Sequence, residues 1–162
     1  MPAAAKLAEV VREVDELARS TQSADELMKH ICERLHQRLL KYNWVGFYMI
    51  QDDAEAGERV LQLGQFVGSM TPHTRIPLNQ GICGAAASTG KTVVVDDVRS
   101  DPRYLACSLE TKSEIVAPIF VHGQVVGEID IDSHFPAAFT PEDRALVEHC
   151  AGLVGRRIEK QA

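Results

Sequence analysis

The sequence predicts an α+β fold, in which a central antiparallel sheet of about six strands carries the N- and C-terminal helices on one face. Two observations support this prediction: helical periodicity at both ends of the chain, and apolar, β-branched runs between them. The apolar stripes of the helices and one apolar face of the sheet can be buried together when the helices pack on that face of an antiparallel sheet. Residues 1–162 contain no repeat, low-complexity segment or linker, so we expect a single domain.

Two helices are expected at the N-terminal end. Residues 4–19 place apolar side chains on one stripe with the spacing of a helix. Ser23 is followed three residues later by Glu26, which is a capping-box signature and predicts the start of a second helix. That second helix carries its own apolar stripe as far as Leu39.

The middle of the chain reads as strands interrupted by one short helix. Residues 42–50 are rich in aromatic and β-branched side chains and predict a strand, the polar run 51–58 predicts a turn, and a second strand follows. Alanine-rich residues after Cys83 favour a helix that Gly90 would end. Residues 92–95 then form a short buried strand.

The last third predicts a loop, a hairpin and a terminal helix. Residues 96–105 are polar and contain a proline, which indicates a loop or one helical turn. Two apolar strands, 115–121 and 124–131, are joined by His122 and Gly123, which suit a tight hairpin turn. A helix begins after Thr140, with proline at its first position and acids in its first turn.

Composition narrows the classes of partner. The formal net charge of −6 argues against a nucleic acid or an acidic membrane surface as partner, and no apolar run reaches the length of a membrane span. The N-terminus lacks the continuous apolar centre of a signal peptide, so we expect a cytoplasmic protein with reduced thiols. The four cysteines form no CxxC pair and show no zinc spacing with histidine, so no metal site is expected.

Two of the four cysteines are candidates for chemistry. Cys83 lies between glycines where a loop enters a helix, and the helix N-terminus would lower the pKa of its thiol. The alternative is a small buried residue at a tight turn. Cys107 lies at the edge of a polar loop, where a thiol is accessible, although a packing role is also open. Cys32 and Cys150 lie beside helical stripes and are interpreted as packing residues.

Acids and aromatics near the strands form a second candidate feature. Asp130 and Asp132 are two residues apart on a strand and share a face, and the hairpin brings Glu114 near one of them. Carboxylates brought together can bind an ammonium group, or one can stay protonated and act as an acid, unless they simply form a solvated strand end. Trp44 and Tyr48 share a strand face and form either core or a pocket wall.

Four sets of motifs follow one another along the chain: YNWVGFY, RIP followed by GICGAAASTGKT, LAC before SEIVAPI, and GEIDIDS before FTPED. Together these motifs resemble the GAF domain family across nearly the whole chain. Within this family, the chain is most similar to the free methionine-(R)-sulfoxide reductases.

The resemblance implies thiol chemistry on a free amino acid. It implies that Cys107 attacks the sulfoxide sulfur, and that Cys83 resolves the product by forming a disulfide that thioredoxin reduces. It implies a substrate pocket of an aromatic pair and three acids, namely Trp44, Tyr48, Glu114, Asp130 and Asp132. No cofactor is needed for this chemistry, and the amphipathic terminal helices allow a homodimer.

Two departures from the reductase pattern keep an alternative open. The reductases typically carry a further cysteine just before the RIP motif, where this chain has His73. They also carry Gly-His before the LAC tripeptide, where this chain has Arg103 and Tyr104. The alternative is a non-catalytic GAF domain that binds a small ligand as a sensor. A cyclic-nucleotide site is disfavoured, because three clustered acids would repel a phosphate.

Overall fold

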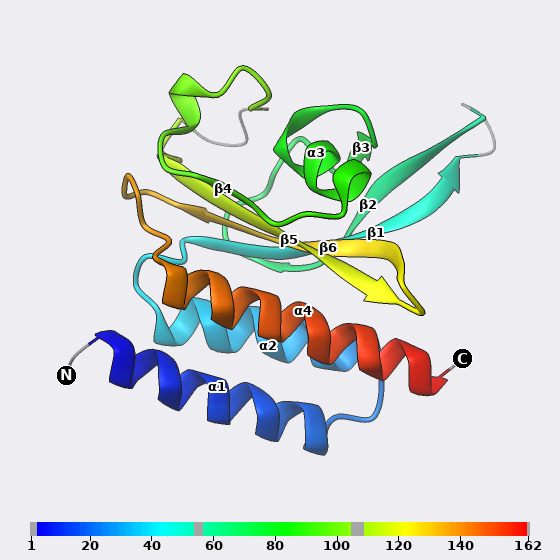
Figure 1. Cartoon of the computed structure of the whole chain (residues 1–162). Helices are drawn as coiled ribbons and strands as arrows, with labels where there is room; N and C mark the ends of the chain where they lie inside the picture. The colour runs from blue at the N-terminus through cyan, green and yellow to red at the C-terminus, as the bar shows by residue number, and fades with distance from the viewer. Residues whose placement is uncertain (1–2, 54–56, 105–108, 162) are drawn as a thin grey trace.

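The computed structural model describes residues 3–53, 57–104 and 109–161. A six-stranded sheet separates two layers of helix, as Figure 1 shows. The helices are α1 (Ala3–Ser20), α2 (Ala24–Arg38), α3 (Gly81–Thr89) and α4 (Pro141–Gln161), with a 3-10 turn η1 (Val98–Ser100). The strands are β1 (Trp44–Asp53), β2 (Glu58–Val67), β3 (Arg75–Pro77), β4 (Val93–Val95), β5 (Ser113–Val121) and β6 (Gln124–Ser133).

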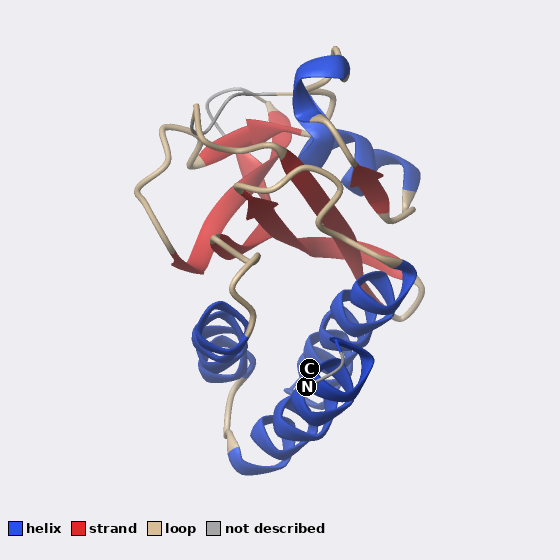
Figure 2. Ribbon diagram, turned by 90° about the vertical axis from the view of Figure 1, so that its left-hand side faces the viewer, coloured by secondary structure: helices blue, strands red, loops and turns tan. Residues whose placement is uncertain are grey.

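The sheet is antiparallel throughout, with the strand order β3-β2-β1-β6-β5-β4. Helices α1, α2 and α4 lie together on one face, and α3 lies on the other, as Figures 1 and 2 show from two sides. The predicted α+β class, with terminal helices on one face, is therefore confirmed. Among the described helices, none combines the length and apolar character needed to cross a bilayer.

Each face of the sheet carries its own apolar core. The larger core lies between the sheet and α1, α2 and α4, and includes Val14, Ile31, Phe47, Ile129 and Val147. The smaller core lies under α3 and includes Trp44, Tyr48, Ile82, Cys83 and Val116. Alternate residues of β1 and β5 therefore belong to different cores, as the two-residue period of a strand requires.

Local sequence signals determine where one helix begins and where one hairpin turns. Ser23 caps α2, since its side chain accepts a hydrogen bond from the Glu26 backbone N–H. The carboxylate of Glu26 reaches back to the Gln22 N–H, one residue before the cap. In the β5–β6 hairpin, His122 and Gly123 both have positive φ (51° and 77°), which is the geometry of the predicted tight turn.

One expectation about the strands was wrong. The run 51–58 was predicted as a turn, yet β1 continues through Asp53 and β2 begins at Glu58. The strand can continue through polar residues because residues 51 and 52 are exposed to solvent, so neither has to pack against a core. Residues 75–77 form the edge strand β3, which pairs with three residues of β2 and completes the six strands.

The packing of α4 on β5 depends on Gly155. A Cβ atom at this position would lie 2.4 Å from the carbonyl oxygen of Phe120, so the two backbones touch. We expect Gly155→Ala to lower the free energy of unfolding by about 1–3 kcal/mol despite alanine's better helix propensity, because an overpacked backbone contact must open.

Gly152 supplies the matched control one turn earlier in α4. A Cβ there would meet the flexible guanidinium of Arg156 at 3.2 Å. Gly152→Ala should therefore be neutral or stabilising by up to about 1 kcal/mol in urea unfolding. Equal effects of the two substitutions would show that the close approach at Gly155 does not control this interface.

Candidate active site

The acids and aromatics gather on the α3 face of the sheet because of the register of three strands. One row across the sheet joins Trp44 of β1, Asp132 of β6 and Glu114 of β5. A parallel row carries Asp130 of β6, which is opposite Gly46 of β1. The predicted proximity of Glu114 to the acids of β6 is thus present, with Asp132 as its direct cross-strand partner.

A third row extends the cluster to an acid that the sequence interpretation missed. Glu128 of β6 is opposite Tyr48 of β1 and belongs to the same strand face as Asp130 and Asp132. The signal was present in the sequence, because Glu128, Asp130 and Asp132 alternate with isoleucine. Only the two acids that close the strand were singled out, so an unbroken line of three carboxylates was overlooked.

The four acids are buried, so the alternative of a solvated strand end is wrong. Glu114, Glu128, Asp130 and Asp132 are each at most 4% exposed. Both carboxylate oxygens of Glu128, and one each of Asp130 and Asp132, have no hydrogen-bond partner among the described residues. A buried carboxylate without partners is costly, so this face requires protons or a bound cation.

Burial changes the acidity of three of these carboxyl groups. It raises the pKa of Glu128 and Asp132 well above their ordinary values, and the charge of Asp130 raises both further. Burial also raises the pKa of Asp130, whereas hydrogen bonds with Glu114 and Cys83 act in the opposite direction. The cluster can therefore retain protons at a pH where exposed carboxyl groups are ionised.

Helix α3 places Cys83 over this acidic face. The chain enters the helix through Gly81, which has a φ of 71°, and Gly84 approaches the Leu78 carbonyl oxygen so closely that a Cβ would lie 2.9 Å from it. The Cys83 thiol then donates a hydrogen bond to Oδ2 of Asp130 at 3.4 Å. The thiol and the acid thus come from opposite layers of the same small core.

The expected acidity of Cys83 was wrong in direction. A helix N-terminus was predicted to lower its pKa, but burial raises the pKa of this thiol well above its ordinary value. The charges of Asp130, Glu128 and Glu114 raise it further. The carboxylates outweigh the helix dipole because they lie close to the sulfur and are buried with it. Cys83 is therefore held as a neutral thiol.

The aromatic pair forms the β1 side of this core. The Trp44 and Tyr48 ring centroids are 6.3 Å apart, and Trp44 also stacks on Phe66 at 5.7 Å. The indole covers Gly46, where a Cβ would lie 2.3 Å from the ring. The Tyr48 hydroxyl donates a hydrogen bond to the backbone oxygen of His73 at 2.7 Å. Tyr48 thereby anchors the segment before β3.

A small pocket opens where these elements meet. It is lined by Tyr48, His73, Ile76, Gly81, Ile82, Cys83, Glu114 and Asp130. His73 occupies the position at which the resembled reductases carry their further cysteine, so that departure falls at the pocket itself. The pocket combines a thiol, two acids and an aromatic side chain, and it can hold a small cationic group or donate a proton.

The remaining cysteines occupy different places. Cys107 lies outside the described residues, so its proposed role stays a prediction. Cys32 and Cys150 are fully buried in the core on the opposite face of the sheet, which confirms that they are packing residues. Burial also raises the pKa of Cys150 to about 12.

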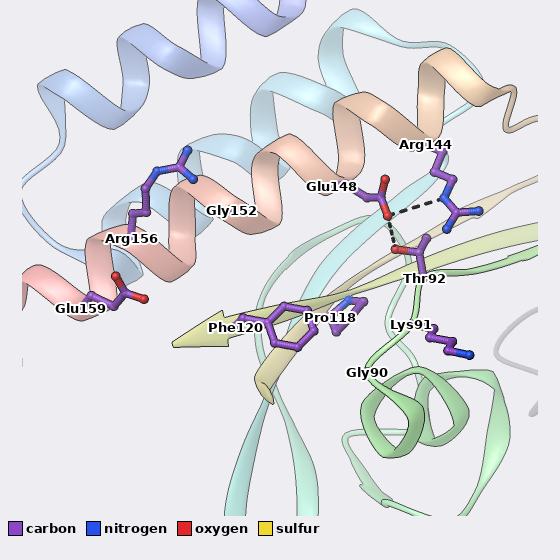
Figure 3. A pocket seen from close by; sticks show the side chains of 10 residues that line it. All are labelled: Gly90, Lys91, Thr92, Pro118, Phe120, Arg144, Glu148, Gly152, Arg156 and Glu159. Atoms are coloured by element: carbon purple, nitrogen blue, oxygen red, sulfur yellow. Dashed lines mark hydrogen bonds and ion pairs between the residues drawn. The ribbon is translucent and has the colours of Figure 1, made fainter. Parts of the chain in front are cut away.

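A larger hollow lies away from the acids, between α4, β5 and the end of α3 (Figure 3). Three of its polar residues interact with one another, since Glu148 accepts a hydrogen bond from Thr92 at 2.6 Å and contacts Arg144 at 3.5 Å. The residues that line it include no cysteine. The candidate chemistry therefore belongs to the smaller pocket under α3.

Several solved structures share this fold. The free methionine-R-sulfoxide reductase of Neisseria meningitidis, solved with its substrate, is 31% identical, with a TM-score of 0.89 over 99% of this chain and 94% of that chain. A type II free methionine-R-sulfoxide reductase from Thermoplasma acidophilum is 39% identical, with a TM-score of 0.77 over 85% of this chain and 93% of that chain.

Sequence comparison also finds free methionine-R-sulfoxide reductases, from two other organisms. The chain is 38% identical to the free methionine-R-sulfoxide reductase of Escherichia coli over 67% of its own length and 62% of that protein. The Saccharomyces cerevisiae enzyme is 41% identical over 70% of this chain and 62% of that protein. The match thus spans less than two thirds of either reductase. The GAF domain family matches residues 23–158, and the chain belongs to this family.

Proposed function

We propose that the protein reduces free methionine-(R)-sulfoxide to methionine, using Cys107 as nucleophile and Cys83 as resolving thiol. The observation that carries this proposal is the buried acid cluster beside the Cys83 thiol, with Trp44 and Tyr48 in the same core. The similarity to reductases from Neisseria, Thermoplasma, Escherichia and Saccharomyces supports the same reaction.

The acids have two tasks in this reaction. Deprotonated members of the set Glu114, Asp130 and Asp132 bind the substrate ammonium, which gives a partner to the unpaired buried oxygens of Asp130 and Asp132. A member that keeps its proton donates it to the sulfoxide oxygen, which becomes a leaving group as charge develops on it. Trp44 and Tyr48 pack against the thioether side chain.

The reaction proceeds in two thiol steps. The Cys107 sulfur attacks the sulfoxide sulfur, the S–O bond breaks, and the oxygen passes to Cys107 as methionine leaves with its sulfur reduced. The Cys83 sulfur then attacks the Cys107 sulfenic acid, releases water and forms a disulfide. Thioredoxin reduces this disulfide by exchange and regenerates both thiols. The protein is thereby an oxidoreductase that needs no organic cofactor.

Substrate discrimination tests the role of the acids. With thioredoxin, thioredoxin reductase and NADPH, we expect steady NADPH oxidation on free methionine-(R)-sulfoxide. We expect kcat/KM to fall at least about 100-fold on the N-acetylated sulfoxide, because the buried acids lose their cationic partner. Equal turnover of the two sulfoxides would contradict the ammonium site, and absence of turnover on both would contradict the proposed reaction.

A small-ligand sensor is the second candidate function. It is favoured by His73, which stands at the pocket where the reductases carry a further thiol. Its expected behaviour is saturable binding of the sulfoxide or another small amine without thiol oxidation. Mass spectrometry after substrate treatment separates the two functions: a peptide in which Cys83 is linked to Cys107 supports the enzyme, and unchanged thiols with bound ligand support the sensor.

A further inference from the structure

The acid cluster offers a site for a metal ion as well as for an organic cation. Glu128, Asp130 and Asp132 have buried oxygens without hydrogen-bond partners, and they are at most 3% exposed. Each proton retained within the cluster can join two of these oxygens, one as donor and one as acceptor. A divalent cation bound to Asp130 would give its carboxylate a partner and would place positive charge beside the other acids of the same strand face.

The ligand geometry comes from three different elements. The Sγ of Cys83 on α3 and carboxylate oxygens of Glu114 on β5 and Asp130 on β6 all lie within 4.8 Å of one another. The distance from Cys83 Sγ to Asp130 Oδ2 is 3.4 Å. A tetrahedral zinc ion with bonds of about 2.3 Å to sulfur and about 2.1 Å to oxygen separates these two atoms by about 3.6 Å.

The donor set selects the class of metal. One thiol with two carboxylates suits borderline-soft zinc or its softer analogue cadmium, whereas magnesium and calcium prefer oxygen ligands alone. With three protein ligands, a water is the usual fourth ligand of zinc. The sequence showed no zinc spacing because the three ligands lie far apart along the chain and meet only across the sheet.

We propose that the reduced protein binds one zinc ion through Cys83, Glu114 and Asp130, and that this ion inhibits turnover. The Cys83 thiol releases its proton to solvent as the zinc–sulfur bond forms. The bound ion occupies the place of the substrate ammonium and blocks the sulfur that resolves Cys107. Zinc binding stands on the geometry alone, whereas the inhibition rests on the proposed function.

Metal titration of the reduced, metal-free full-length chain tests the site. We expect zinc to bind with a stoichiometry of one by calorimetry, and cadmium to give an ultraviolet sulfur-to-metal charge-transfer band. Cys83→Ser should remove the band, and Asp130→Asn should weaken zinc binding by at least about 100-fold, since even loss of an outer-shell partner costs 10–100-fold. Circular dichroism of each variant checks that the fold is retained.

Cys150→Ser is the matched control, because Cys150 is another buried thiol but lies in the core under α4. It should bind zinc and cadmium like the unchanged protein. Absence of binding, or binding that survives both Cys83→Ser and Asp130→Asn, would overturn the proposal.

The reductase assay separates this inference from the proposed function. Turnover by the metal-free protein with unchanged activity after zinc addition would overturn the inhibitory site and leave the reductase intact. Zinc binding by a protein without turnover would support the metal site and overturn the reductase. Turnover that zinc lowers, and a chelator restores, supports both.

Discussion

Replacing Cys107 by serine is expected to lower turnover of free methionine-(R)-sulfoxide by at least about 10³-fold, as for loss of other essential nucleophiles. Serine is nearly the same size as cysteine, but its hydroxyl is a far poorer nucleophile toward sulfur. The variant should release no methionine even in a single turnover. Quenched-flow chromatography of methionine measures this directly.

Replacing Cys83 by serine should give a different kinetic pattern. The first step needs only Cys107, so one equivalent of methionine per chain should appear before the reaction stalls at the sulfenic acid. The stall follows because the thiol that hydrogen-bonds to Asp130 is gone, and with it the proposed partner for the disulfide. A dimedone adduct on Cys107 should accumulate in this variant.

Cys32→Ser is the control for both variants, because Cys32 is buried in the opposite core and donates to the Gln65 backbone oxygen at 3.6 Å. It should cycle at the unchanged rate. Full cycling of Cys83→Ser with thioredoxin would show that another thiol resolves Cys107. A burst of methionine from Cys107→Ser would show that the nucleophile lies elsewhere.

The second large effect concerns stability and pH, through Glu128. Burial raises the pKa of Glu128 well above its ordinary value, which it regains on unfolding. Between these two pKa values the folded protein binds more protons than the unfolded chain, so this group makes the free energy of unfolding fall as pH rises. Below the unfolded pKa the group has no such effect.

Glu128→Gln removes this titration while keeping the side-chain shape. We expect the free energy of unfolding of the variant to rise relative to that of the unchanged protein as pH increases from the unfolded pKa of Glu128 toward its raised folded pKa. This relative gain should shrink toward pH 4. Urea unfolding measured from pH 4 to pH 8 tests this difference in slope.

Glu58→Gln is the control, since Glu58 is exposed at the start of β2. It should leave the pH dependence of unfolding unchanged. If Glu128→Gln gives the same slope as the unchanged protein, Glu128 does not contribute the proposed titration.

The sequence predicted those features that depend on neighbours along the chain. The Ser23 cap and the His122–Gly123 turn follow from local hydrogen bonding and backbone freedom, and both are present. The proximity of Glu114 to one of the two acids, Asp130 or Asp132, followed from a hairpin register, which is also local, and the register observed makes Asp132 the direct partner. Such features can be predicted without knowing the rest of the fold.

Features that depend on burial escaped the sequence interpretation. The acidity of Cys83 was wrong because the layer that covers it, and the acids of β6 against its sulfur, come from distant segments. Glu128 was overlooked because a glutamate that alternates with apolar residues is typical of the solvent-exposed face of a strand. In the folded protein α3 covers that face, and Glu128 is buried. Desolvation is a property of the assembled layers, and no short motif encodes it.

Trp44 has a consequence for how unfolding is observed. It is the single tryptophan of the chain, and it lies in the core under α3, with its indole N–H bonded to the Ser69 oxygen at 3.0 Å. Indole fluorescence therefore reports on that side of the sheet, whereas far-ultraviolet dichroism is dominated by α1, α2 and α4 on the other. Two superimposable denaturation curves would mean that both layers melt as one cooperative unit.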